Sequence, residues 1–198
     1  MTWGEVQIES LKKMFLNSED LSVNSLETYK NDKKYKTYLF AMPQACNEAI
    51  KYITAMLGTR VERFTLEKTN IDDIYDLSTL IKDFRKVKNI ICPMGVLWKM
   101  RNDSLLEIND WYTGTIEIYY EINPRYITST TDINEKIDIE EMYAVVIPLY
   151  IAGELYKDDD LSMATMYMNE FMNMINIFSS GNTYIDNPRI ESIYRIGD

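Results

Sequence analysis

The sequence predicts an α+β fold: a helical bundle of about four helices with an inserted small antiparallel β-region and an extended C-terminal tail. Apolar residues recur at helical spacing near both ends of the 198-residue chain. Between them, residues 115–122 alternate almost strictly between apolar and polar side chains, which is typical of a half-buried strand. The last twenty residues, 179–198, follow a helical pattern but have no period of their own.

The first expected helix covers residues 2–16, where apolar side chains recur at helical spacing. Thr2 is suited to be its N-cap, because a threonine hydroxyl can accept the backbone N–H three residues further on. That residue is Glu5, whose carboxylate can return the contact and complete a capping box. Residues 17–31 are polar and are expected to be irregular.

A second helix is expected at residues 33–57, again from apolar side chains at helical spacing. Pro43 lies inside it, and proline removes a backbone donor, so we expect a kink or a short break there. Gly58 is suited to end the helix, because glycine adopts the left-handed backbone of a helix C-terminus at little cost.

Short runs of β-branched and aromatic residues fill the chain from residue 59 to about residue 126, and turn signals such as Pro93-Met94-Gly95 separate them. They predict a small antiparallel sheet of about four strands, with a helical turn at residues 76–84. The strands are expected at residues 60–66, 88–92, 97–100 and 115–122.

The helical period then returns in a third expected helix at residues 139–156, which Pro148 is expected to kink. Residues 157–160 form an acidic turn that supplies an aspartate N-cap to the next helix. The fourth helix is expected at residues 161–178.

These elements divide the chain into four expected parts, each with its own pattern. They are the N-terminal helices of the bundle at 1–58, the inserted β-region at 59–130, the C-terminal helix pair that completes the bundle at 131–178, and the tail at 179–198.

The tail combines residues that break regular structure with apolar residues that an ordinary solvated tail lacks. We therefore expect it to bind a partner. Its candidate contact residues are Tyr184, Ile185, Pro188, Ile190, Ile193, Tyr194 and Ile196.

The charge argues against a basic nucleic-acid surface, since the formal net charge is −10. Residues 132–160 alone carry nine acidic side chains against two lysines. Two local basic clusters are candidates for phosphate contact, although solvated faces are the default interpretation. They are Lys30, Lys33, Lys34 and Lys36, and Lys82, Arg85, Lys86 and Lys88.

The chain contains no histidine, which removes serine–histidine triads, cysteine–histidine pairs and imidazole bases. Its glycines match no phosphate-binding loop. The run Asp158, Asp159 and Asp160 lacks the spacing of a calcium loop and fits a helix-capping turn better, so neither a metal nor a cofactor is expected.

Cys46 and Cys92 lie in apolar patterns and are expected to be inert core thiols of a reduced, intracellular protein. No apolar run approaches the roughly 20 residues of a membrane span, so no membrane partner is expected.

The order of elements resembles the head-to-tail adaptor proteins of tailed bacteriophages, also described as connector or gatekeeper-ring proteins. The order is two helices, a β-insertion, a helix, an acidic turn, a long helix and an apolar tail. Short matching segments lie at residues 1–5, 45–50, 149–156, 158–160 and 167–171. Because of the β-insertion, the layout is most similar to the adaptors of short-tailed phages.

The resemblance implies a structural virion protein and not an enzyme. It implies a dodecameric ring that docks beneath the portal, continues the channel for double-stranded DNA and presents a platform to tail or nozzle proteins. It also implies assembly in the host cytoplasm and a final location in the neck or tail of the virion. Family adaptors hold the portal through C-terminal segments, a role that falls here on residues 179–198.

Glu154, Asp158, Asp159 and Asp160 are candidate channel-facing acids, because an acidic wall repels phosphate and lets a duplex slide.

Three alternatives remain open at the level of sequence. The chain could be a tail-terminator or another neck or tail ring protein. It could be an intracellular binding or regulatory module outside phage biology. It could be a hydrolase with a carboxylate pair in the central sheet, formed by Asp110 with Glu117 or Glu121.

Overall fold

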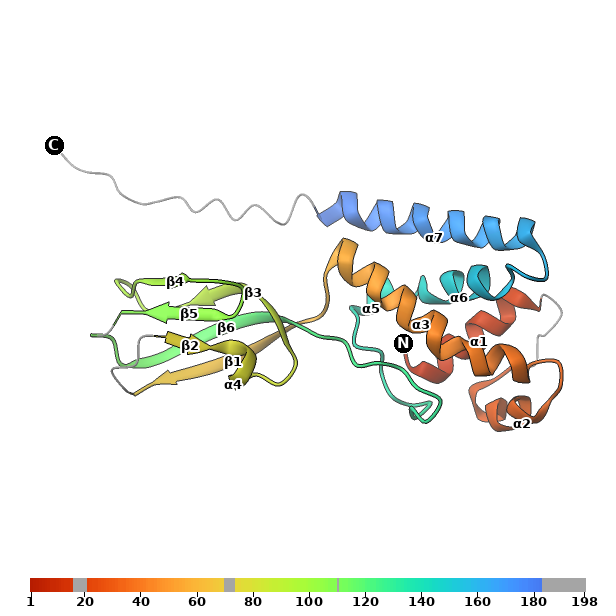
Figure 1. Cartoon of the computed structure of the whole chain (residues 1–198), viewed down its shortest axis with the longest axis horizontal. Helices are drawn as coiled ribbons and strands as arrows, with labels where there is room; N and C mark the ends of the chain where they lie inside the picture. The colour runs from red at the N-terminus through yellow and green to blue at the C-terminus, as the bar shows by residue number, and fades with distance from the viewer. Residues whose placement is uncertain (16–20, 70–73, 110, 183–198) are drawn as a thin grey trace.

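The computed structural model describes residues 1–15, 21–69, 74–109 and 111–182. It combines helices with small antiparallel sheets, which confirms the mixed α+β class. All helices except the short α4 lie at one end of an elongated molecule, and α4 lies with the strands at the other end (Figure 1). Two segments join the ends. One leads from Gly58 into the first strand, and the other begins at Asn123, after the last strand, and leads back to the helices.

The first helix, α1, covers Trp3–Met14 and begins with the expected capping box. The backbone N–H of Glu5 donates to Thr2 Oγ1 at 3.3 Å, and the Thr2 N–H donates to Glu5 Oε2 at 2.7 Å. This box satisfies two backbone donors that a helix start leaves unpaired.

The expectation of an irregular segment at residues 17–31 is wrong in its second half. Val23–Ser25 forms the 3₁₀ turn η1, and Leu26–Asn31 forms the helix α2. Leu26 is fully buried and packs into the helical core. One apolar residue makes no period, so this turn of helix depends on tertiary packing and not on a local pattern.

The helix α3 covers Lys36–Leu57 and starts three residues later than the sequence predicts. It is continuous through Pro43, so the short break expected there is absent from this helix. Gly58 ends it with a φ of 87° and donates its N–H to Thr54 O at 3.2 Å. A side chain at Gly58 would also meet the carboxylate of Glu121, so both the backbone and the space favour glycine there.

The single kinked helix expected at residues 139–156 is wrong, because the structure has two helices, α5 at Glu141–Ala144 and α6 at Ile147–Leu155. Pro148 lies in the first turn of α6, where its missing N–H has no intrahelical partner to lose. The proline thus starts a helix and does not bend one.

The last helix, α7, covers Leu161–Asn182. It begins at the expected residue but runs four residues past the expected end at 178. The tail start at residue 179 is therefore wrong, because residues 179–182 continue the helix. The Ser180 hydroxyl donates to Asn176 O at 2.6 Å within this last turn. Glycine is tolerated in a final helical turn, so Gly181 does not end the helix.

The strands within the described residues form two three-stranded antiparallel sheets, in the orders β1-β6-β3 and β2-β5-β4. The expectation of one sheet with about four strands is therefore wrong. Between β2 and β3, the helix α4 at Leu77–Leu80 lies inside the segment expected to hold a helical turn. The strands are β1 Val61–Lys68, β2 Ile74–Asp76, β3 Phe84–Ile91, β4 Trp98–Met100, β5 Leu105–Ile108 and β6 Gly114–Ile122.

The strand β6 is the centre of the larger sheet, with Ile118 opposite Phe64 on β1 and Ile90 on β3. The start of β3 escaped the sequence pattern because register shifts after Phe84 and Val87 interrupt the alternation. The strands β2 and β5 are too short to show a period of two.

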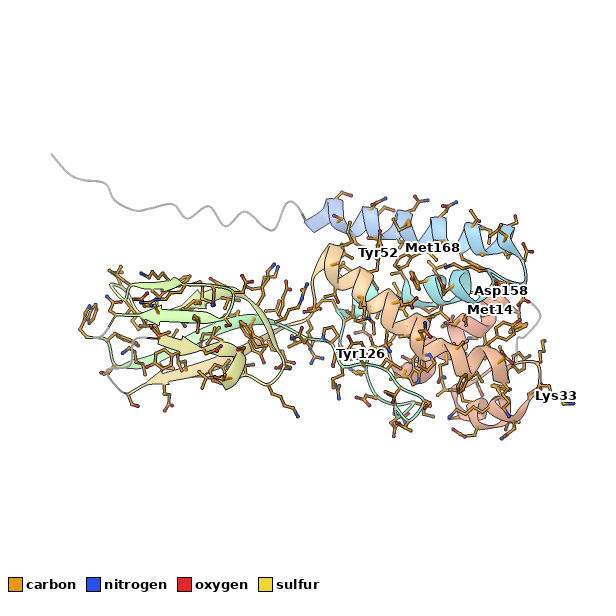
Figure 2. The ribbon with its side chains drawn as sticks, in the orientation of Figure 1. Met14, Lys33, Tyr52, Tyr126, Asp158 and Met168 are labelled. Atoms are coloured by element: carbon orange, nitrogen blue, oxygen red, sulfur yellow. The ribbon has the colours of Figure 1, made fainter. Side chains whose placement is uncertain are left out.

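The helical end and the β end each have an apolar core of their own among the described residues. In the helical part, α6 packs against α1, α3 and α7. Tyr52 of α3 and Met168 of α7 lie where these two helices face each other (Figure 2). In the β part, the inward side chains of both sheets form the second core around Leu106, Ile116 and Ile118. None of the helices in the described ranges has the length and apolar composition needed to cross a lipid bilayer.

Candidate interaction surfaces

The predicted partner-binding residues Tyr184, Ile185, Pro188, Ile190, Ile193, Tyr194 and Ile196 all lie outside the described residues. The structure adds the position of Asn182, the last described residue before them. The helix α7 ends at Asn182, at the end of the helical part from which α3 leads into β1 (Figure 1).

The candidate channel acids lie together at the turn between α6 and α7, at the end of the helical part farthest from the sheets, as the label of Asp158 indicates (Figure 2). Asp160 caps α7, because its Oδ1 accepts the N–H of Ser162 at 2.9 Å and that of Met163 at 3.1 Å. Glu154 forms an ion pair with Lys157 one turn away.

Asp159 contacts a different helix. Its Oδ2 accepts the hydroxyl of Tyr38 on α3 at 2.6 Å, and this hydrogen bond, with burial, raises the pKa of Tyr38 to about 12. Asp158 is exposed and makes no hydrogen bond or ion pair in the described part of the chain. Three of the four acids therefore have a structural task, and only Asp158 is left entirely to solvent or to a partner.

Two of the three carboxylates of the hydrolase alternative, Glu117 and Glu121, form ion pairs with basic side chains. Glu117 pairs with Arg63 at 3.3 Å, while Glu121, whose side chain is 1% exposed, pairs with Arg85 and with Lys88 at 3.1 Å. Asp110 lies outside the described residues. Paired carboxylates of this kind do not resemble an open acid–base pair in a cleft.

Ion pairs also occupy the junction between the helical and β parts. The buried carboxylate of Asp138 accepts the Arg125 guanidinium at 2.7 Å and lies 3.6 Å from that of Arg60. Burial acts to raise the pKa of Asp138, but the hydrogen bonds from Arg125 outweigh it and hold the pKa below its usual value. Arg85 of β3 donates to Thr54 O of α3 at 3.3 Å, which ties the larger sheet to the end of that helix.

The basic clusters are partly used within the chain. Lys30 pairs with Glu27 at 2.5 Å, and Lys34 lies 4.8 Å from the ring centre of Phe15. In the second cluster, Arg85 and Lys88 both bind Glu121. These contacts favour the interpretation of solvated and structural cations over a phosphate surface. Of the residues that the structure describes, no three histidine, cysteine, aspartate or glutamate side chains gather as a metal site would require.

An apolar groove of about 420 Å³ opens on the helical part. Phe40 stands at its side with 82% of its surface exposed, whereas Trp3 and Gln7 are buried. The Gln7 Oε1 is buried and has no hydrogen-bond partner among the described residues. The lining comes from α1 (Trp3, Gln7), α2 (Lys30), α3 (Lys36, Thr37, Leu39, Phe40, Pro43) and the loop before α5 (Ser129, Thr131, Ile133).

A second apolar surface, the distal tip, lies at the end of the β part farthest from the helices (Figure 1). The pairing of the strands places it there. Ile91 lies opposite Glu117 near the start of β6, and Trp98 lies opposite Ile108 at the end of β5. Its members and their exposed fractions are Ile91 at 50%, Met94 at 103%, Leu97 at 72%, Trp98 at 41% and Trp111 at 64%.

A tight turn presents Met94 at this tip. Val96 donates its N–H to Pro93 O at 3.2 Å, and Gly95 has a φ of 88°, the value that a type II turn requires at its third residue. The buried Val96 side chain anchors the turn, and the Asn109 N–H joins the neighbouring loop by donating to Leu97 O at 3.1 Å. The sequence marks Pro93-Met94-Gly95 as a turn, but it does not indicate that the apolar residues around it remain uncovered.

Comparison with protein-family models and with curated proteins found no match to this sequence.

Proposed function

We propose that this chain is a structural virion protein that forms a ring between the portal and the tail of a bacteriophage and continues the channel through which DNA leaves. In this proposal the tail docks on the portal, and α1, α3, α6 and α7 act as the four-helix bundle of each ring subunit. Tail or nozzle proteins bind the opposite side of the ring.

The observation that carries the proposal is the position at which α7 ends. This helix of 22 residues packs along the helical part and ends at Asn182, and the sequence after it, residues 183–198, is rich in isoleucine and tyrosine. Fully extended, that segment reaches roughly 50 Å at about 3.3 Å per residue, which is enough to lie on a neighbouring molecule.

Ring formation is supported by the presence of two different apolar surfaces on one chain, the groove and the distal tip. A ring needs heterologous contacts, in which one patch of a subunit meets a different patch of the next. The exposed Asp158 and the acidic turn around it are the proposed channel wall, since negative charge there repels the phosphate backbone.

The experiment compares the full chain with a chain truncated after Asn182, which retains all of α7. We expect the truncated protein to keep its helical circular dichroism and to lose binding to portal rings in a pull-down and in electron micrographs. The double variant Ile190→Ser and Ile193→Ser should weaken binding, because each change removes apolar area from the contact. The matched double variant Arg189→Ala and Ser192→Ala, at neighbouring positions, should bind as the full chain does.

Portal binding by the truncated protein would contradict the assignment of the tail. Copurification with tail-tube proteins and not with the portal would favour a tail-terminator position instead. We also expect the isolated chain to be largely monomeric in native mass spectrometry and to form rings only when portal is added.

A further inference from the structure

We propose that β1, the edge strand Val61–Lys68, pairs antiparallel with β1 of a second copy of this chain, so that the two larger sheets join across a two-fold axis. The inference goes beyond the proposed function, because a two-fold contact closes on itself and makes a pair and not a ring. It therefore concerns the free chain, before a ring forms.

The strand β1 has no neighbouring strand on its outer side among the described residues. The order of the larger sheet is β1-β6-β3, and β1 runs along one margin of the β part (Figure 1). Alternate residues of an edge strand direct their backbone N–H and C=O groups away from the sheet, where these groups can bind a further strand. All eight residues of β1 pair with β6 in unbroken register, so its outer edge is long and regular.

The other edge of the same sheet is protected against such pairing. Register shifts after Phe84 and Val87 interrupt the regular course of β3, and the exposed Lys86 and Lys88 give it charges of one sign. Bulges and lysines are common means by which proteins prevent edge strands from pairing. The strand β1 has neither a register shift nor a proline, and its charges are of both signs.

The outward face of β1 is complementary to itself. Arg63, Thr65 and Glu67 are exposed on this face, while Phe64 and Leu66 belong to the face that packs on the core of the β part. When two β1 strands run antiparallel about a two-fold axis at Thr65, Arg63 of each copy lies opposite Glu67 of the other. The two Thr65 side chains lie opposite each other. Opposite charges and threonine pairs directly across antiparallel strands both stabilise the pairing.

Among two-fold axes placed at residues 63–67, only the axis at Thr65 matches the charges. An axis at Phe64 would place Arg63 opposite Thr65, and an axis at Leu66 would place Thr65 opposite Glu67. An axis at Arg63 or at Glu67 would place that charge opposite its own copy, which is destabilising. An axis between two residues would place an exposed side chain opposite one of the core face, so the pleat of the strands excludes it.

The contact adds only one strand of eight residues to each sheet, and backbone hydrogen bonds supply most of its affinity. Because so small a contact associates weakly, we expect pairing in concentrated protein and a largely monomeric chain in the dilute solutions of native mass spectrometry.

The test is disulfide trapping through Thr65→Cys, because directly opposite residues of antiparallel strands have Cβ atoms close to the separation that a disulfide spans. The protein also carries Cys92→Ser, while the fully buried Cys46 remains. Under oxidised glutathione, concentrated protein should form a covalent dimer several-fold faster than the control Thr115→Cys. Thr115 is exposed and lies opposite Glu67 in the central strand β6, so it belongs to the same sheet but not to its edge.

Charge reversal identifies the register. In the Thr65→Cys protein, Arg63→Glu and Glu67→Arg should each slow trapping about tenfold, because each places like charges opposite each other twice in the pair. A mixture of the two variants should recover most of the rate, since each pair across the two different chains then joins opposite charges. The mixture contains the same two proteins, so misfolding of a variant cannot produce the recovery.

Equal trapping rates for Thr65→Cys and Thr115→Cys would overturn the inference, and so would a mixture that traps no faster than its separate variants. The portal experiment is independent, because it uses no introduced thiol. Portal binding without trapping would leave the proposed function and remove the pairing, whereas trapping without portal binding would leave the pairing and remove the assigned position in the virion.

Discussion

The acidic residues at the turn between α6 and α7 are neighbours in sequence but differ in what they contact. Asp160 binds two backbone N–H groups of α7, Asp159 binds Tyr38 of α3, and Asp158 binds nothing within the described residues. Consecutive carboxylates with such different surroundings should respond differently to substitution, since the cost of a change depends on the contacts it removes.

Asp160→Ala should lower the free energy of unfolding by about 1 kcal/mol, because it leaves two backbone donors at the start of α7 without their cap. Asp158→Ala should change it by less than about 0.5 kcal/mol, as exposed unpaired side chains usually do. Urea titration followed by circular dichroism measures both. Equal losses for the two variants would show that Asp160 is not the cap in solution.

Asp138 should make stability depend on pH. Its pKa is lowered in the folded chain, so its stabilising contribution is present above the unfolded pKa of about 3.9 and is lost as the pH falls through the lower folded value. The full chain should therefore lose more stability between about pH 5 and pH 2 than the Asp138→Asn variant does. Urea midpoints across that range measure the difference. The control is the Asp158→Asn variant, because Asp158 has no ion-pair partner in the described residues.

At the level of elements, close packing of α6 against α7 positions the start of the last helix. A Cβ atom added at Gly153 would lie 3.2 Å from Ala164 O and 3.3 Å from Met168 N, both of them backbone atoms of α7. A backbone cannot move aside as a flexible side chain can, so the absence of a side chain at residue 153 sets the distance between the two helices.

Gly153→Leu should therefore destabilise the chain by about 2 kcal/mol or more, because a large side chain must push α7 away or adopt a strained rotamer. The neighbouring Glu154→Leu, which removes only the ion pair with Lys157, should cost less than about 1 kcal/mol. Thermal unfolding compares the two variants. A fully tolerated leucine at residue 153 would mean that the helices are less closely packed than described.

At the scale of the molecule, the described residues form two apolar cores, with ion pairs around Asp138 and Glu121 at the junction between them. Each core is built from side chains of its own end, and the junction has charged groups where a shared core would have apolar ones. A substitution that weakens one of these cores should therefore destabilise its own end of the molecule and leave the other end largely unchanged.

Ile118→Ala should cost about 2 to 4 kcal/mol, because Ile118 is fully buried in the core of the β part. We expect faster amide hydrogen exchange in β1, β3 and β6 while the protection of α6 and α7 changes little. Ile151→Ala in α6 should give the reverse pattern. A uniform loss of protection in either variant would indicate a single cooperative unit.

The sequence by itself determined the features that depend on neighbours along the chain. The α+β class, the capping box at Thr2, the C-cap at Gly58, the Asp160 cap and the β6 strand follow from local patterns, since each is stabilised mainly by residues a few positions away. The same locality explains why the turn at Met94 was predicted.

Only the tertiary structure decided the features that depend on distant contacts. The helical core buries Leu26 and so stabilises α2, and the short strands β2 and β5 form by pairing with each other. The groove and the distal tip also belong to this group, because whether an apolar side chain is covered depends on which remote residues fold over it. The sequence lists Phe40 and Met94 as apolar, but only the fold leaves them in solvent.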